Sequence, residues 1–172
     1  MGRIIYICGG AKSGKSTMAL SLAKETKGAV AFIATAEAKD REMKKRIMAH
    51  KASRPKNWLT LEEPIDIDRA LSKIDPQTRT VIVDCITLWI TNLMMRKKNQ
   101  RYIEDKTRTV IDICKKIRAR CIFISNEVGS GIVPSNKLSR EFRDIAGRIN
   151  QMIADASSEA YFMVSGLPMR IK

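Results

Sequence analysis

A glycine-rich segment near the start of the sequence constrains the fold more than any other feature. Residues 9–16 read GGAKSGKS and fit the phosphate-loop (P-loop) pattern G-x-x-x-x-G-K-[ST] at every position. An apolar run at residues 4–8 precedes the segment, and helix-forming residues follow it. A strand, such a loop and a helix in this order bind phosphate, because the glycines let backbone N–H groups approach its oxygens and the helix presents a positive dipole end. We therefore predict a nucleotide-binding fold, and a glycine turn without a ligand is the less favoured alternative.

Each position of this loop has an expected role. The Lys15 ammonium is expected to contact the β- and γ-phosphates, and the Ser16 hydroxyl is expected to bind Mg²⁺, the cofactor that accompanies the nucleotide. The other positions bring backbone N–H groups to the phosphates. The predicted nucleotide contacts of the loop are Gly9, Gly10, Ala11, Lys12, Ser13, Gly14, Lys15 and Ser16.

Apolar runs alternate with helix-forming segments along the rest of the chain. Strands are expected at residues 4–8, 29–34, 80–84, 121–125 and 160–165, with a weaker candidate at 58–62. Helices are expected at residues 15–26, 38–51, 66–73, 86–96, 102–118 and 137–157. Several of the runs are apolar throughout, which is typical of strands covered on both faces. The alternation predicts one α/β domain over residues 1–172, a P-loop NTPase-type three-layer fold with helices on both faces of a mostly parallel, doubly wound sheet.

Composition limits the class of protein. No apolar run reaches the length of a membrane span, and a strand begins almost at the N-terminus, so we expect neither a membrane span nor a signal peptide. The four cysteines form no C-x-x-C pair and are expected to be small buried residues of a cytoplasmic protein. The net charge of +14 favours anionic ligands. A nucleic-acid-binding P-loop ATPase is disfavoured, because the basic residues are spread along the chain with few aromatic residues beside them.

Residues 81–84, VIVD, form an apolar run that ends in a carboxylate. In P-loop proteins a carboxylate at the end of such a strand holds Mg²⁺, directly or through water. Asp84 is therefore a predicted metal ligand, together with Ser16. The alternative is that Asp84 caps the helix expected at residues 86–96, and the two roles are compatible.

Two short GTPase-like signatures are interpreted as chance matches. The D-x-x-G match at residues 144–147 falls inside a predicted helix and not at a strand end. The N-K-x-D match that begins at Asn136 has Ser139 where the guanine-binding Asp is required. A signalling-type GTPase is therefore disfavoured, and the preference for ATP or GTP in a kinase reaction cannot be read from the sequence.

His50 is the only histidine of the chain and lies in a strongly basic segment, RIMAHKASRP. Arg46 and His50 are four residues apart and are expected on one helix face. The plain interpretation is a surface histidine on a basic helix. The alternative is a nucleophile, since a neutral imidazole can attack phosphorus and form a phosphoramidate. The glycine-rich segment 126–134, NEVGSGIVP, follows a strand and is a candidate substrate-contact loop or a plain connection.

Several of these segments together resemble one family. They are GGAKSGKS at 9–16, FIATA at 32–36, RIMAHKASRP at 46–55, DCITLWITNL at 84–93, NEVGSGIVP at 126–134, REFRDIAGRINQ at 140–151 and the final VSGLPMRIK. The chain resembles the bifunctional adenosylcobinamide kinase / adenosylcobinamide-phosphate guanylyltransferase of cobalamin biosynthesis. The resemblance implies phosphorylation of the aminopropanol hydroxyl of adenosylcobinamide by ATP or GTP. It then implies transfer of GMP from GTP to that phosphate, which yields adenosylcobinamide-GDP and pyrophosphate.

The resemblance also implies roles for individual residues. It implies a covalent guanylyl-histidine at His50 and a homotrimeric assembly. The GTP contacts that it adds to the P-loop are Ala34, Thr35, Ala36, Lys51, Ala52, Ser53, Arg54, Glu62 and Asp84. Some members have two adjacent histidines where this chain has Ala49 and His50, and some have Glu at the position of Asp84. The first difference removes ambiguity about the nucleophile, and the second shortens the metal ligand by one methylene. The remaining alternative is a small-metabolite P-loop kinase without guanylyl transfer.

Overall fold

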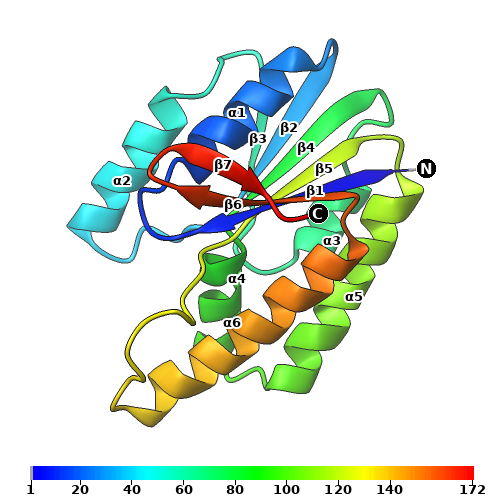
Figure 1. Cartoon of the computed structure of the whole chain (residues 1–172). Coiled ribbons are helices and arrows are strands. Elements are labelled where there is room, and N and C mark those ends of the chain that lie inside the picture. Colours follow the sequence, from blue (N-terminus) through cyan, green and yellow to red (C-terminus); the bar gives the residue numbers. More distant parts are fainter. Residues whose placement is uncertain (1) are drawn as a thin grey trace.

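A seven-stranded sheet with strand order β3-β2-β4-β5-β1-β6-β7 forms the centre of the structure (Figure 1). The computed structural model describes residues 2–172. All neighbouring strands run parallel, except that β7 pairs antiparallel with β6. The strands are β1 (Arg3–Gly9), β2 (Ala29–Ala34), β3 (Leu59–Glu62), β4 (Thr78–Asp84), β5 (Arg120–Ile124), β6 (Glu159–Val164) and β7 (Leu167–Arg170).

Six helices connect the strands and cover the two faces of the sheet. They are α1 (Lys15–Glu25), α2 (Arg41–Ala52), α3 (Ile67–Ser72), α4 (Ile86–Met95), α5 (Gln100–Lys116) and α6 (Lys137–Ala156). Figure 1 shows α1 on one face and α3 to α6 on the other. The predicted three-layer α/β fold is therefore confirmed.

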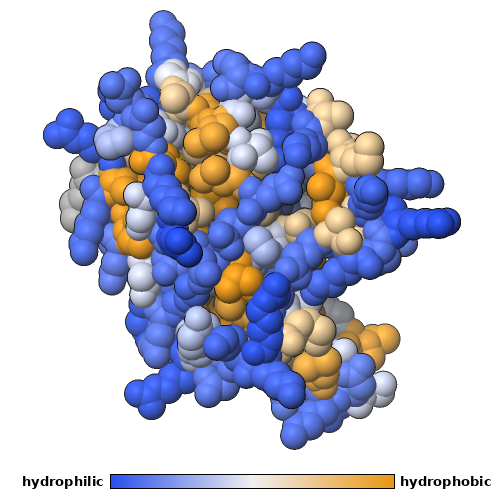
Figure 2. Space-filling view, turned by 180° about the vertical axis from the view of Figure 1, so that it is seen from behind, coloured by the Kyte–Doolittle hydropathy of each residue, from blue (hydrophilic) through white to orange (hydrophobic). Residues whose placement is uncertain are grey.

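The core divides into two layers because successive side chains of a strand point to opposite faces. On β1, Ile4 and Tyr6 pack in the layer under α3 to α6, whereas Ile5 and Ile7 pack in the layer under α1. Both sets are almost fully buried, which explains why the strands read as continuous apolar runs. The face of the molecule shown in Figure 2 is mostly hydrophilic, and its apolar residues lie in separate patches.

The predicted strands and helices are confirmed, with ends that shift by one to three residues. Helix α2 begins at Arg41 and not at residue 38, because Asp40 is its N-cap and accepts a hydrogen bond of 2.7 Å from the Met43 N–H. Helix α5 begins at Gln100 because Asn99 caps it in the same way, at 2.9 Å from the Tyr102 N–H.

Strand β7 is the element that the sequence did not predict. Its residues are all exposed, and it contains Pro168, so it carries neither alternation nor an apolar run. Proline is tolerated there because β7 is an edge strand. The turn before it consists of Ser165 and Gly166, both with positive φ (50° and 86°), which is the backbone of a tight two-residue hairpin.

Two expectations from composition are met by the described residues. No helix within residues 2–172 has the length and apolar character needed to cross a membrane. The cysteines Cys8, Cys85, Cys114 and Cys121 are free and buried.

Candidate active site

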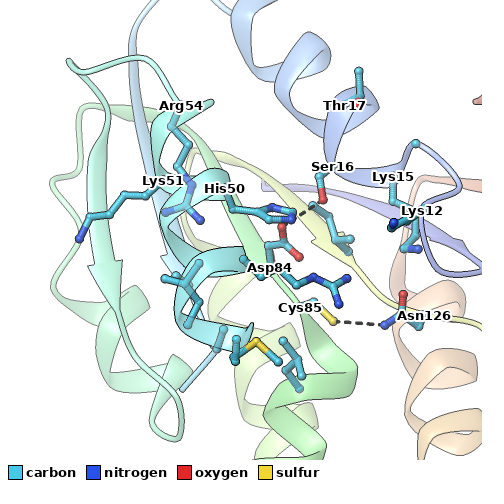
Figure 3. Close-up of a pocket in the computed structure, with 18 of the residues that line it drawn as sticks. Lys12, Lys15, Ser16, Thr17, His50, Lys51, Arg54, Asp84, Cys85 and Asn126 are labelled. Atoms are coloured by element: carbon cyan, nitrogen blue, oxygen red, sulfur yellow. Dashed lines mark hydrogen bonds between the residues drawn. The ribbon is translucent and has the colours of Figure 1, made fainter. Parts of the chain in front are cut away.

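A pocket of about 350 Å³ opens at the carboxyl ends of β1, β2 and β4, where ligands bind in open α/β sheets. Its wall combines the P-loop, one face of α2 and the ends of β4 and β5. Figure 3 shows the P-loop lysines and His50 on opposite sides of this space, with Asp84 between them.

The P-loop follows β1 and wraps over the start of α1. Gly14 has a φ of 98°, and a Cβ atom there would also lie only 3.1 Å from Gly166 Cα. Lys15 donates from Nζ to the backbone oxygens of Gly9 (3.0 Å) and Gly10 (2.5 Å), so its ammonium lies over the loop. Burial lowers the pKa of Lys15, while Cys85 and Asp84 act in the opposite direction. The loop therefore places a cation and the N-terminus of α1 at one wall of the pocket.

The C-terminal hairpin supports this loop from outside the pocket. The Gly166 N–H donates a hydrogen bond of 3.0 Å to the Ser13 backbone oxygen. A Cβ atom at Gly9 would lie 2.5 Å from the Met163 backbone oxygen, so this position requires glycine. The phosphate loop is thus fixed by β6 and the turn before β7.

Asp84 lies at the floor of the pocket, at the end of β4. The Ser16 hydroxyl donates to its Oδ2 at 3.2 Å. Helix α4 starts after Cys85 without a side-chain cap, so the alternative role of Asp84 as a helix cap is not seen. Burial raises the pKa of Asp84, although His50, Ser16, Arg54 and Lys15 all favour its ionised form.

The oxygens of Asp84 and Ser16 suit Mg²⁺, which prefers hard oxygen ligands and keeps several waters or phosphate oxygens in its shell. Among residues 2–172 no cluster of three or more His, Cys, Asp or Glu side chains is placed to hold a metal ion. The donor set therefore fits a cation that arrives with a nucleotide better than a resident structural ion.

Helix α2 presents one face to the pocket. Met43, Arg46, Ile47 and His50 all line it, at the spacing of one helix face. The predicted common face of Arg46 and His50 is therefore confirmed. In Figure 3 the His50 imidazole points toward Ser16 and Asp84. Helix α2 itself has no buried residue.

Two cations after His50 have fixed partners. Lys51 Nζ lies 2.7 Å from Glu62 Oε1, and this hydrogen bond lowers the pKa of Glu62. The Arg54 guanidinium stacks 3.6 Å from the centre of the Phe32 ring. Burial lowers the pKa of Arg54. A half-buried guanidinium that lies over a ring in this way keeps its N–H groups available to an anion.

The structure brings most of the predicted site residues to the pocket wall. Those that line it are Lys12, Ser13, Gly14, Lys15, Ser16, Ala34, Ala36, His50, Lys51, Arg54, Glu62 and Asp84. Six lie outside the lining: Gly9, Gly10, Ala11, Thr35, Ala52 and Ser53. Thr35 is fully buried, and its hydroxyl donates to the Cys85 backbone oxygen at 2.8 Å, so its side chain joins β2 to the end of β4.

Sequence reasoning did not single out several lining residues. They are Thr17, Met43, Ile47, Cys85, Leu88, Ile124 and Asn126. Met43 and Ile47 were not predicted as pocket residues because apolar residues on a helix usually face the core. Asn126 was included only as part of the glycine-rich loop. The thiol of Cys85 hydrogen-bonds to the Thr87 hydroxyl at 2.8 Å, and burial raises its pKa.

The two GTPase-like signatures have structural roles elsewhere. Asn136 caps α6, since its Oδ1 accepts from the Ser139 N–H at 2.7 Å. Asp144 lies inside the same helix, away from the pocket lining. Their interpretation as chance matches is confirmed.

Comparisons with known proteins identify the family of the chain. The family model described as cobinamide kinase / cobinamide phosphate guanyltransferase matches residues 5–171. The bifunctional adenosylcobalamin biosynthesis protein CobP of Pseudomonas aeruginosa is 43% identical over 166 residues, which cover 96% of this chain and 95% of that protein. Proteins of the same description, named CobU, are 37% identical in Salmonella typhimurium and 35% identical in Escherichia coli, each covering 98% of this chain and 99% of the relative. The chain therefore belongs to the cobinamide kinase / cobinamide phosphate guanyltransferase family.

Proposed function

We propose that this protein carries out two successive reactions in the one pocket described above. It first phosphorylates the aminopropanol hydroxyl of adenosylcobinamide with ATP or GTP. It then transfers GMP from GTP to adenosylcobinamide phosphate through a guanylyl-histidine at His50. The observation that carries the proposal is that the P-loop, Asp84 and the single histidine of the chain all line the same pocket.

The kinase reaction needs a triphosphate held at its β- and γ-phosphates. The substrate hydroxyl attacks the γ-phosphorus, the bond from that phosphorus to the β-bridging oxygen breaks, and the hydroxyl proton is released. The P-loop N–H groups and Lys15 stabilise the charge on the departing diphosphate. Mg²⁺ held by Ser16 and Asp84 would neutralise the phosphates further.

The guanylyl transfer requires attack at the α-phosphorus instead. A neutral imidazole nitrogen of His50 attacks GTP, and the bond to the β-phosphate breaks, so that pyrophosphate leaves and a phosphoramidate forms. A phosphate oxygen of adenosylcobinamide phosphate then attacks the same phosphorus, the P–N bond breaks, and the imidazole is released. Arg46, Lys51 and Arg54 surround this end of the pocket with positive charge.

The position of His50 on α2 suits a nucleophile that approaches its target. Because α2 buries none of its residues, a shift of this helix toward the nucleotide disrupts no core packing. The Lys51–Glu62 pair, which joins α2 to the end of β3, is a polar contact that such a shift would stretch.

The test uses GTP labelled at the α-phosphate. Wild-type protein is expected to acquire a label that is acid-labile and base-stable, and peptide mapping is expected to place it on His50. The His50→Ala variant is expected to lose the label and the guanylyl transfer but to keep cobinamide phosphorylation. A matched control, Met48→Ala, alters an exposed residue of the same helix outside the pocket. Phosphorylation by wild-type protein without any label would favour the simple kinase.

The homotrimer is a separate proposal. The exposed side chains of Leu167, Met169 and Ile171 along edge strand β7 support burial of that edge in an assembly. Light scattering on the purified protein tests it, and a monomer at micromolar concentration would contradict it.

A further inference from the structure

The end of β5 occupies a special place in the sheet. Strand β5 lies between β1, which leads into the P-loop, and β4, which ends at Asp84. Ile124 pairs with Ile7 on one side and with Asp84 on the other. The residues that follow it therefore emerge between the phosphate loop and the metal-binding carboxylate. Of these, Asn126 lines the pocket.

A network of buried polar groups holds Asn126 in place. Its Nδ2 donates to the Thr87 hydroxyl at 3.0 Å and lies 3.9 Å from the Cys85 sulfur. Its backbone oxygen accepts from Asn150 Nδ2 at 3.2 Å, and the Asn150 Oδ1 accepts from the Ser125 hydroxyl at 2.6 Å. Three of these partners, Thr87, Asn150 and Ser125, are less than 9% exposed. Such a network fixes one orientation of the amide.

This orientation leaves the side-chain oxygen of Asn126 directed into the pocket. Within residues 2–172 no donor contacts its Oδ1, and Figure 3 shows this oxygen on the side of the P-loop and the nitrogen on the side of Cys85. The neighbouring Glu127 is directed elsewhere, since its Oε1 accepts from the N–H groups of Gly129 and Ser130. Asn126 therefore provides the inward acceptor of this loop.

The chemistry of an amide oxygen excludes phosphate as its partner. A phosphate oxygen also carries lone pairs and would repel it, so the Oδ1 suits a hydrogen-bond donor or a cation. The cation of the nucleotide already has Ser16 and Asp84 as its proposed ligands, which leaves a hydrogen-bond donor. Lys15 already donates to the backbone oxygens of Gly9 and Gly10. The donor that the kinase reaction brings to this place is the attacking hydroxyl.

Asn126 lies at the end of the pocket where the γ-phosphate is expected. The Glu127 N–H donates to the Gly9 backbone oxygen at 3.0 Å, which joins this loop to the start of the P-loop. Lys15, the expected β/γ-phosphate ligand, donates to the same Gly9 oxygen, whereas His50 lies across the pocket in Figure 3. One end of the pocket thus offers the Asn126 oxygen as an acceptor for a substrate hydroxyl. The other end offers His50 as a nucleophile.

We propose that Asn126 is a substrate-positioning residue for phosphorylation alone: its Oδ1 accepts a hydrogen bond from the primary or secondary hydroxyl that attacks the γ-phosphorus. The hydrogen bond aligns an oxygen lone pair with the γ-phosphorus. As the new P–O bond forms, the bond from that phosphorus to the β-bridging oxygen breaks, the diphosphate leaves, and the hydroxyl proton passes to solvent. Guanylyl transfer to His50 needs no hydroxyl at this place and does not use Asn126. The assignment rests on the kinase activity proposed above.

The experiment compares three variants in two assays. Phosphorylation of adenosylcobinamide by γ-labelled ATP gives kcat and KM, and α-labelled GTP gives the rate of His50 labelling. Asn126→Ala is expected to lower the kinase kcat about 100-fold, which is the scale of a lost positioning group in proton-transfer chemistry. Labelling of His50 and the affinity for nucleotide should stay within about twofold of wild type.

Thr87→Val tests the orientation separately, because it removes the acceptor that holds Nδ2. It is expected to lower the kinase kcat by a smaller factor, about 10-fold, with labelling unchanged. The control is Asn136→Ala, which removes the cap of α6 on the same connection and should leave both rates unchanged.

Two results would overturn the assignment. One is a kinase kcat of Asn126→Ala within about threefold of wild type. The other is an equal loss of phosphorylation and of His50 labelling, which would reveal a structural role for the network. If the wild-type protein labels His50 but phosphorylates no cobinamide, the proposed kinase function itself is refuted. That outcome is read from the wild type alone and does not depend on the Asn126→Ala variant.

Discussion

Replacing Asp84 by Asn should stabilise the free protein and abolish the contribution of Mg²⁺ to its stabilisation by nucleotide. Asp84 lies at the pocket floor, where burial raises its pKa even though His50, Ser16, Arg54 and Lys15 favour the ionised form. The net upward direction means that the desolvation cost exceeds the sum of those attractions. An asparagine keeps an acceptor oxygen for the Ser16 hydroxyl at nearly the same place and removes the charge.

The size of the effect follows from this balance. A buried ion carries an effective penalty of several kcal/mol, and the neighbouring cations offset part of it, so we expect Asp84→Asn to gain on the order of 1–2 kcal/mol. For a chain of 172 residues this corresponds to a rise in Tm of about 2–8 °C.

The pH dependence of stability provides a second test of whether ionised Asp84 destabilises the folded protein. A carboxyl whose folded-state pKa is raised binds more protons in the folded than in the unfolded state between the two pKa values. Stability of the wild type therefore falls as pH rises through that window, and the full penalty is present above the raised pKa. The Tm difference between Asp84→Asn and wild type should vanish at low pH and reach a plateau above the window.

Differential scanning calorimetry over a pH series, with and without Mg-GTP, measures both effects. Wild type should gain about 2.7 kcal/mol at a ligand concentration of 100 Kd, and Asp84→Asn should show the same small gain with or without Mg²⁺. The control Asp112→Asn alters an exposed carboxylate of α5 and should change neither. A lower Tm for free Asp84→Asn at neutral pH, or an unchanged magnesium response, would refute the reasoning.

Three further substitutions probe other parts of the molecule. Lys15→Ala should impair both phosphorylation and His50 labelling, because both reactions need the bound triphosphate; a loss of only one, measured with labelled nucleotides, would contradict this. Arg54→Ala should weaken nucleotide affinity about 10-fold or more, the value of a charge-assisted hydrogen bond, in equilibrium titration, whereas Arg41→Ala, exposed at the start of α2, should leave it unchanged. Trp89→Phe removes the hydrogen bond of 2.8 Å to the Ile65 backbone oxygen and should cost about 1–3 kcal/mol in urea unfolding; an equal midpoint would show that water replaces it.

The sequence predicted those strands and helices whose buried positions are occupied by apolar residues. Strands β1 and β4 were found because both of their faces are covered, so apolar residues follow one another without a break at 4–8 and at 81–83. Strand β7 was missed because it is an exposed edge strand, so its residues show neither an apolar run nor an alternation of apolar and polar residues. Its antiparallel pairing with β6 depends on the turn at Ser165 and Gly166, a local signal too short to be distinctive.

The same distinction applies to the site. The loop at residues 9–16 and Asp84 were predicted because their chemistry requires particular residue types at strand ends. The position of Thr35 beneath the pocket could not be foreseen, since a buried threonine and a ligand-binding threonine read alike. The role of Asn126 depends on β5 being inserted between β1 and β4, and strand order is not written in local sequence.

The hairpin that supports the P-loop has a consequence for the order in which the protein acquires its function. The P-loop leaves the ribosome long before Gly166 is synthesised, and the Gly166 N–H donates the hydrogen bond that holds the Ser13 backbone oxygen. Contacts between such distant segments close late in folding, because chain entropy must be lost before they form. A nascent chain therefore displays the phosphate motif without a finished phosphate site, and nucleotide binding begins only when the far edge of the sheet has been added.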